Sequence, residues 1–363
     1  MGFDSFLGNA NAVAAVRGML AQDRAPGALL FTGPDGVGKK TLALMLAKAM
    51  NCERLKDDFC GECGRCKKAD ELLAAAQEDL ARRREIKESQ RRVEGLIYFD
   101  VQIIEPITRY ILIEQIRQLR TVSYTRPFEF PRRVFIIDQA QTIHWQAVDL
   151  LLKVLEEPPE TTTFVLVCVN PRELRPTIRS RCHPIPFVPV EEQIISKFVA
   201  NNANLNPAQR ALAIRVAAGS IAAAQSIDLR AFLAQRQPWL DFLDAVAPQR
   251  KAPSSKVSWK QVFDSTRTLT ENRDTFEGTL KIGYTLLRDM MALREVGAEA
   301  RIVHIDLIQR LKAWSERLGM TGIETIKVAL DQAYRQQVRN VNQQLALDAL
   351  AVELDPHLLR RPV

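Results

Sequence analysis

The sequence predicts an α/β domain with a parallel sheet, followed by domains built from helices alone. A glycine-rich loop, GPDGVGKKT, lies at 33–41 between a short apolar run and a helical pattern. Two apolar, β-branched runs, VFIID at 134–138 and FVLVCV at 164–169, are typical of parallel strands buried on both faces. After the proline-rich segment at 182–190, strand-like runs end and helical periodicity continues.

Composition indicates a soluble globular protein of more than one domain. Of the 363 residues, 47% are apolar, and a chain of this length exceeds one ordinary core, so we expect two or three domains. No apolar run approaches the roughly 18 residues of a membrane span, and MGFDSFLGNA lacks the pattern of a secretory signal. We therefore expect a cytoplasmic protein with no membrane partner. The formal charge of +7 is compatible with a nucleic-acid partner but does not require one, and solvated helix surfaces are the favoured explanation.

The predicted elements of the first domain follow one another in a meaningful order. A helical pattern at 12–22 precedes the apolar run ALLF at 28–31, which ends in the glycine loop. TLALMLAKAM after the loop is helical, so strand, loop and helix occur in the order that a phosphate-binding loop requires. Between the two later strands, AVDLLLKVLEE predicts a helix that ends before two prolines.

The second half of the chain divides into helical segments. A short alanine-rich unit spans 191–235, PQRKAPSSK at 248–256 has the composition of a linker, and 257–355 predicts a bundle of amphipathic helices. The expected domains are 1–189, 190–240 and 241–363.

The glycine loop matches most of a phosphate-binding pattern. In G-x-x-x-x-G-K-[ST], the glycines let backbone N–H groups turn inward around phosphate oxygens, and the lysine reaches the β and γ groups. Gly33, Gly38 and Lys39 fill their places. The last position requires a hydroxyl that ligates magnesium, but Lys40 stands there and puts a cation where the metal would bind. Thr41 lies about 100° further round the helix, so its hydroxyl does not substitute.

The acidic part of an ATPase site is also incomplete. Such a site needs one acid at the end of a hydrophobic strand to hold hydrated magnesium, and a second beside it to orient water. VFIIDQAQ supplies Asp138 but places Gln139 second, and glutamine cannot act as a base. A strand-end aspartate that accepts backbone donors is an equal alternative for Asp138. The candidate residues of this degenerate nucleotide site, whose occupancy by ATP stays open, are Gly33, Gly36, Gly38, Lys39, Lys40, Thr41 and Asp138.

Four cysteines predict a metal site. Cys52, Cys60, Cys63 and Cys66 form C-x7-C-x2-C-x2-C, and two residues between cysteines let neighbouring thiolates converge on one tetrahedral ion. Four thiolates favour a closed structural zinc site that does not catalyse. An iron-sulfur cluster and unligated thiols are the alternatives, although the ferredoxin-type run uses another spacing. Cys168, inside a predicted strand, is expected to be ordinary core.

Two further segments carry concentrated charge. The segment 67–94 combines both signs of charge at i,i+4 spacing and predicts an exposed helix that projects from the domain. LRPTIRSRC places Arg181 between a helix and a strand, from where an arginine can reach a neighbouring subunit's γ-phosphate, a contribution worth roughly 10³ to 10⁵ in rate. On spacing alone, an ordinary surface arginine is favoured.

These residues together resemble a known family. LFTGPDGVGKKTLA, the four-cysteine insertion, IEQIRQL, VFIIDQAQTI, LLKVLEEPPETTTFVLV and LRPTIRSRC are similar to the bacterial DNA polymerase III clamp loader subunits of the AAA+ superfamily. The resemblance covers most of 1–190 and implies a P-loop AAA+ domain with a zinc module at 52–66. A small helical lid domain and an all-α collar domain would follow, and RNVNQQLALDAL resembles the last collar helix. The segment at 67–94 has no clear counterpart.

The family contains two kinds of subunit with this cysteine module. The gamma or tau motor hydrolyses ATP and carries GKT or GKS, a DE pair, and an arginine in a G-S-x-R stretch. This chain has GKK, DQ and AAGSIAAA, which puts Ala222 in place of that arginine. The three losses agree with delta prime, a stator that is usually inactive. The resemblance implies that Arg181 is the trans-acting arginine finger. It also places Asn170 at a sensor position, where we expect a structural role because this site lacks chemistry of its own. Tyr98, Phe99 and Asp100 depart from the family's His-Pro-Asp stretch.

The resemblance also implies partners. They are the gamma/tau and delta subunits, the sliding clamp, and primed DNA reached through the complex. The chain would be part of the DNA polymerase III holoenzyme without ATPase activity of its own. An ATP-hydrolysing motor is one alternative. A second is a DNA-binding AAA+ module with salt-dependent affinity, whose basic surface would include Arg82, Arg83, Arg84, Arg91 and Arg92.

Overall fold

The structure is a computed structural model of the chain that divides into two compact units. The first comprises Met1–Phe198 and Gly219–Gln225, and the second comprises Val199–Ala218 and Ser226–Val363. The boundaries expected at 189 and 240 stay a prediction. The residues that the structure describes are 2–87, 93–200, 205–247, 259–270, 276–337, 344 and 347–348.

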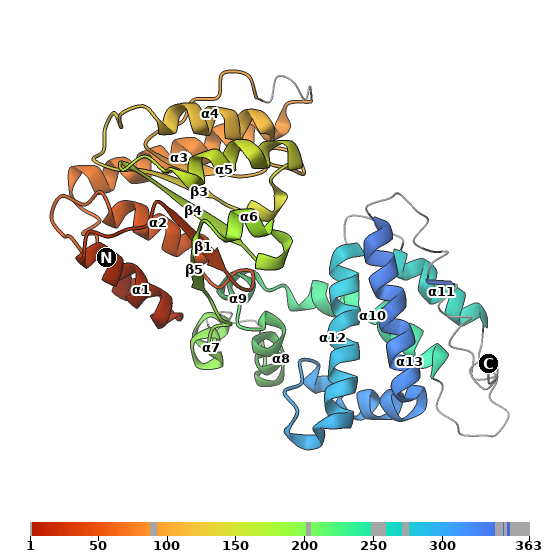
Figure 1. Cartoon of the computed structure of the whole chain (residues 1–363). Coiled ribbons are helices and arrows are strands. Elements are labelled where there is room, and N and C mark those ends of the chain that lie inside the picture. Colours follow the sequence, from red (N-terminus) through yellow and green to blue (C-terminus); the bar gives the residue numbers. More distant parts are fainter. Residues whose placement is uncertain are drawn as a thin grey trace. The chain divides into compact units, whose positions relative to one another are not determined.

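A parallel sheet forms the centre of the first unit (Figure 1). Its strands lie in the order β2-β3-β4-β1-β5, and every described pair is parallel. All residues of β2, β3 and β4 are buried, as expected for strands covered on both faces. The strands are β1 (Ala28–Thr32), β2 (Val101–Ile104), β3 (Arg133–Ile137), β4 (Thr162–Cys168) and β5 (His183–Pro186).

Helices pack against this sheet. One core cluster joins Phe135 and Phe164, whose rings stack at 5.8 Å, to buried Leu119 of α4 and Leu151 of α5. The expected α/β domain with a parallel sheet is thereby confirmed. The helices of this part of the chain are α1 (Ala10–Ala21), α2 (Lys39–Ala49), α3 (Gly64–Glu85), α4 (Ile113–Ser123), α5 (Val148–Glu156), α6 (Pro176–Arg179), α7 (Glu192–Ala200) and α9 (Ile221–Ser226).

Strand β2 was not foreseen from the sequence, and β5 only as an unplaced strand after Cys182. VQII is a four-residue run after a segment without periodicity, so only its pairing with β3 identifies it as a strand. HPIP contains Pro184 and Pro186, which cannot donate to a ladder. It is a strand because it lies at the sheet edge and pairs on one side only, with β1.

The charged segment 67–94 forms a helix, but the expectation that it projects is wrong for the described part. Helix α3 begins at Gly64, within the cysteine motif, and ends at Glu85. One of its faces is buried and includes Leu72, Leu73 and Ala76. Exposed charges such as Glu71, Glu78 and Arg82 lie away from this face, whereas Arg83, whose side chain is 11% exposed, lies on it and pairs with Asp79. The segment therefore packs as an amphipathic helix.

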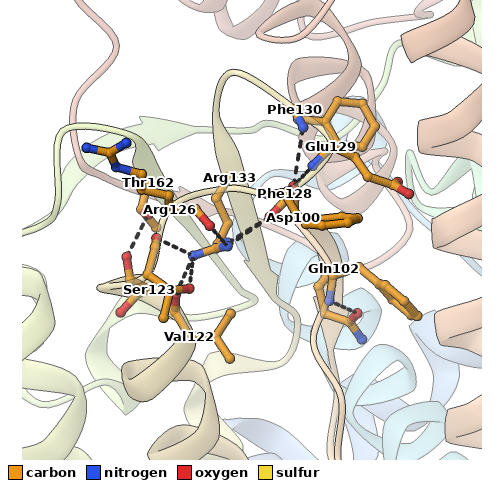
Figure 2. Close-up of polar contacts among 12 residues, drawn as sticks. Asp100, Gln102, Val122, Ser123, Arg126, Phe128, Glu129, Phe130, Arg133 and Thr162 are labelled. Carbon is orange, nitrogen blue, oxygen red and sulfur yellow. Dashed lines mark hydrogen bonds and ion pairs between the residues drawn. The ribbon is translucent and has the colours of Figure 1, made fainter.

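A buried ion pair anchors the loop between α4 and β3. The side chains of Asp100 and Arg133 are each 4% exposed, and the Arg133 Nη2 atom donates to Asp100 Oδ1 at 2.9 Å. Figure 2 shows the other Asp100 oxygen accepting backbone N–H groups from Phe128, Glu129 and Phe130. Asp100 thus fixes the loop 124–132 to the start of β2.

The second unit is helical throughout its described residues, which confirms the expected all-α C-terminal part. Its core contains fully buried Trp239, Phe242, Phe276 and Trp314. The chain leaves helical geometry at Gly319, whose φ is +64°. The longer helices are α8 (Pro207–Ala217), α10 (Leu229–Val246), α11 (Trp259–Thr270), α12 (Phe276–Glu295) and α13 (Ile308–Gln337).

Several expectations fall outside the described residues. These are the linker PQRKAPSSK, most of RNVNQQLALDAL, and the side chains of Arg91 and Arg92. Among the described helices, none combines the length and apolar character needed to cross a bilayer.

A buried histidine stabilises the second unit. His304 is 0% exposed and accepts at Nδ1 from Arg236 (3.2 Å), while Nε2 lies 3.0 Å from Thr285 Oγ1. These contacts match the neutral ring with its proton on Nε2. Burial lowers the pKa of His304 to about 4, and the positive charges of Arg236 and Arg288 act in the same direction against the opposing carboxylates of Asp289 and Asp306.

We predict that acid destabilises the second unit through His304. Because the folded-state pKa is depressed, the unfolded state binds more protons, and stability is lost as pH falls from 6.5 to about 4, by about 3 kcal/mol. Tryptophan fluorescence during urea unfolding at pH 7 and pH 4.5 measures this change, since Trp239 and Trp314 are buried in the same unit. A His304→Gln variant should show a smaller dependence on pH; an unchanged dependence would refute the assignment.

We also predict that Asp100→Asn destabilises the first unit by about 3–5 kcal/mol, because the Arg133 charge would stay buried without its partner. The matched control is Asp23→Asn. Its carboxylate is 90% exposed and pairs with Arg132 at 3.1 Å, so the cost should stay below about 1 kcal/mol. Calorimetric melting of both variants provides the comparison, and equal effects would contradict the prediction.

Candidate functional site

The loop GPDGVGKKT connects β1 to α2 and needs its glycines. Gly33, Gly36 and Gly38 have φ values of +140°, +71° and +99°, which residues with a Cβ rarely adopt. Neighbouring atoms also leave no room for a side chain at two of these glycines. A Cβ at Gly36 would lie 2.0 Å from Ser220 Oγ, and one at Gly33 would lie 2.3 Å from the Phe187 carbonyl oxygen.

A pocket of about 570 Å³ opens beside this loop. Gly36, Gly38, Lys39, Lys40 and Thr41 line it on the loop side. Asp138, at the end of β3, lines it as well, so the structure brings the predicted site residues together around one cavity. The apolar part of the lining comes from Phe6, Leu7, Met45, Val167, Val169, Phe198 and Ile221.

The Lys39 ammonium is held by the loop itself. Its Nζ atom donates to the carbonyl oxygens of Gly33 at 2.7 Å and Pro34 at 2.5 Å. Lys39 is only 5% exposed, and burial lowers the pKa of its ammonium. The loop donors are partly used as well, because the N–H of Gly36 donates to Asp35 Oδ1 at 3.0 Å.

Lys40 occupies the acidic end of the pocket. Its ammonium pairs with Glu105, which follows β2, and lies 3.7 Å from Asp138 Oδ2. The second oxygen of Glu105 accepts from Arg84 of α3 at 3.1 Å. Burial raises the pKa of Asp138, although the positive charge of Lys40 opposes this. The residues present do not fit a magnesium ion, because an ammonium stands between the carboxylates that would hold one.

The contacts of Asp138 match the strand-end alternative that the sequence left open. Its Oδ1 atom accepts the N–H of Gln139 at 2.9 Å, which is the role of a strand-end residue, and its other oxygen faces Lys40. The sequence interpretation missed Glu105. The sequence did contain a signal for Glu105, namely an acid directly after VQII. That signal can be used only when VQII is recognised as a strand.

Two segments that are distant from the glycine loop in the sequence pack against it. The N–H groups of Ile221 and Ala222 donate to the Gly36 carbonyl oxygen at 2.9 and 3.2 Å. Ala222 also lines the pocket. From the N-terminal side, the Phe6 ring lies so near Gly38 that an added Cβ would meet it at 2.7 Å.

The four predicted cysteines meet in one cluster. The sulfur atoms of Cys52, Cys60, Cys63 and Cys66 all lie within 4.8 Å of one another, so they are close enough to hold one metal ion. Backbone N–H groups of Glu62 and Cys63 lower the pKa of Cys60 to about 6, which favours the thiolate that metals bind. Cys168 is 1% exposed within β4, as expected for core.

The cysteine loop is fastened to the N-terminal segment. Asp58 accepts the backbone N–H of Phe3 at 2.9 Å and pairs with Arg17 at 2.8 Å. The rings of Phe3 and Phe59 meet edge to face at 5.8 Å. These contacts place the segment that carries Phe6 next to the cysteine cluster, so order in the cysteine loop supports one wall of the pocket.

Arg181 lies at the surface, just after α6. Its Nη2 atom donates to Glu156 Oε1 at 2.6 Å, and Nη1 donates to the Thr177 carbonyl oxygen at 2.9 Å. The side chain is 33% exposed. Glu156 ends α5 and belongs to the LEEPP stretch, so it orients Arg181; the sequence interpretation did not identify this role.

Two arginines of the predicted basic surface, Arg83 and Arg84, are engaged within the protein. Arg83 donates to Asp79 and to the carbonyl oxygens of Glu94 and Gly95. Arg84 is bound to Glu105 and to the carbonyl oxygen of Pro106. These guanidinium groups have protein acceptors, which weakens the interpretation of this segment as a phosphate grip.

A family model described as DNA polymerase III, delta subunit, matches residues 8–191. The chain belongs to this family. It is 25% identical over 338 residues to DNA polymerase III subunit delta' of Bacillus subtilis, and the match covers 92% of each chain. This relative therefore aligns through both compact units.

Tau and gamma subunits of DNA polymerase III match a shorter part of the chain. The chain is 29% identical over 194 residues to the tau subunit of Bacillus subtilis, which covers 53% of this chain and 30% of tau. It is 29% identical over 198 residues to the gamma subunit of Buchnera aphidicola, covering 54% of this chain and 48% of gamma. These matches therefore span less than two thirds of the relatives' own length.

We predict that the purified chain holds one metal ion and that Cys63→Ser releases it. Loss of one thiolate from a closed four-sulfur site removes metal-binding energy that is also folding energy, so the melting temperature should fall. Elemental analysis by mass spectrometry and thermal melting test this, with Cys168→Ser as the control for losing a cysteine outside the cluster. Metal-free wild-type protein of equal stability would contradict the prediction.

Proposed function

We propose that this chain is the delta' subunit of the DNA polymerase III clamp loader, a stator that does not hydrolyse ATP. The observation that carries the proposal is Lys40, whose ammonium pairs with Glu105 and approaches Asp138 where a motor subunit would bind magnesium. Gln139 in place of a base supports the same conclusion. The match to a delta' subunit over 92% of both chains agrees with it.

The stator would act through Arg181. The guanidinium is exposed at the surface and is oriented by Glu156 at 2.6 Å, so a neighbouring motor subunit's γ-phosphate can compete for it. A charge supplied in trans stabilises the transition state of phosphoryl transfer. Arg181 is thus the proposed trans arginine finger, and its partner site belongs to another chain.

The remaining parts of the proposal follow from this assignment. The partners are the gamma/tau and delta subunits, with which the helical second unit forms a collar, and the complex loads the sliding clamp onto primed DNA in the cytoplasm. The metal in the cysteine cluster is zinc, because four thiolates in a closed tetrahedral site are its usual structural ligands. Zinc there stabilises the cysteine loop and takes no part in chemistry.

We predict that Arg181→Ala lowers the DNA-stimulated ATPase of the assembled loader. Turnover at the neighbouring motor site should fall by about 10³-fold or more, and the total rate by that site's share. The experiment compares wild type and variant, alone and mixed with motor and delta subunits, clamp and primed DNA. The matched control, Arg175→Ala, removes a positive charge from the same exposed segment and should leave the rate unchanged.

The ATPase assay and a DNA-binding measurement on the isolated chain together distinguish the rival functions. Turnover by the isolated chain that Lys39→Ala abolishes would identify a motor. Salt-dependent DNA affinity of the isolated chain, reduced by changing Arg82, Arg83 and Arg84, would identify a DNA-binding module. An assembled rate that does not respond to Arg181→Ala would remove the finger assignment.

A further inference from the structure

We propose that the pocket beside the glycine loop binds a nucleoside triphosphate without a divalent metal, with the Lys40 ammonium in the place of the ion. This inference goes beyond the proposed function and is independent of Arg181, because it concerns the chain's own pocket. It rests on the positions of two lysines, on the acids around them and on the shape of the cavity.

Magnesium is excluded by charge and by geometry. A magnesium ion needs oxygen ligands at about 2.1 Å in nearly ideal octahedral geometry. The Lys40 Nζ atom lies 3.7 Å from Asp138 Oδ2 and is paired with Glu105, so an ion bound by Asp138 would lie next to a positive charge. The hydroxyl ligand is missing as well, since Lys40 stands at its position.

The Lys40 ammonium can still donate a hydrogen bond to a phosphate oxygen. An ammonium has three donors, and Glu105, its principal partner, is shared with Arg84 at 3.1 Å. Lys40 lines the pocket, whereas Glu105 does not, and the Lys40 side chain is 34% exposed. It can therefore donate to an oxygen in the pocket while the carboxylates hold its position.

The rest of the cavity suits a nucleotide. Backbone N–H groups at the start of α2 favour an anion, and Lys39 also lines the pocket. Apolar side chains such as Met45, Val167 and Phe198 offer a wall for a base. A volume of about 570 Å³ lies within the range of small-molecule sites.

Two carboxylates that line the pocket, those of Asp35 and Asp138, oppose an anionic ligand. Asp35 lines the pocket, and its carboxylate accepts the Gly36 N–H at 3.0 Å, so it both repels phosphate and uses a loop donor. Binding should therefore be weaker than in a site without this acid. Asp35→Asn, which keeps an acceptor and removes the charge, should tighten binding.

The test is calorimetric titration of the full-length chain with ATP, once in EDTA and once in excess magnesium chloride. We expect ATP to bind in EDTA and to bind more weakly in excess magnesium, because the ion sequesters free ATP in solution and the site takes the nucleotide without it. Tripolyphosphate should compete with ATP if the loop holds the phosphates. Lys39→Ala and Lys40→Ala should each weaken ATP binding in EDTA by about tenfold or more, a loss typical of a charge-assisted hydrogen bond. Lys67→Ala, on the exposed face of α3, is the matched control and should bind as wild type does.

The decisive variant is Lys40→Thr. It restores the hydroxyl and leaves Glu105 and Asp138 without their cation, so ATP binding should become tighter in magnesium than in EDTA. Circular dichroism verifies that each variant is folded. Wild-type binding that requires magnesium, no detectable binding of millimolar ATP in either buffer, or a folded Lys40→Thr variant that ignores magnesium would each overturn the proposal.

Discussion

The parallel arrangement of the strands is the constraint on which the site depends. Parallel strands end at the same edge of a sheet, so the loop after β1, Glu105 after β2 and Asp138 after β3 meet although they are far apart in the chain. Lys40 begins the helix that follows the loop, and its ammonium bridges the two acids. The position between these two carboxylates, where a metal ion could bind, is thereby occupied by the Lys40 ammonium.

Glu105, the partner of Lys40, also connects helix α3 to this edge of the sheet. Arg84, near the end of α3, binds the same Glu105 that Lys40 binds. The helix that begins in the cysteine motif therefore ends close to the acids beside the glycine loop. Its other face is buried through Leu72 and Leu73, so the guanidinium is held at this place by packing.

A second path leads from the cysteine cluster to the pocket through the N-terminus. Asp58 of the cysteine loop holds Phe3 and Arg17, and Phe6 follows close by and covers Gly38. A closed metal site at the cysteines would order this segment without touching a ligand. The module thus supports the shape of the site, which agrees with a structural role.

The sequence by itself determined the elements and site residues whose signals are local. Strand, glycine loop and helix at the start, the buried runs that became β3 and β4, and the cysteine spacing all depend on neighbouring residues, and the structure has them where they were expected. Lys40 and Gln139 stand at single positions of known motifs, so their chemical consequence was visible as well. Only the tertiary structure decided β2 and β5, because VQII and HPIP become strands through pairing with β3 and β1. It also decided that Glu105, Arg84 and Glu156 act at these sites, since their partners are 21 to 65 residues away and no local pattern encodes such contacts.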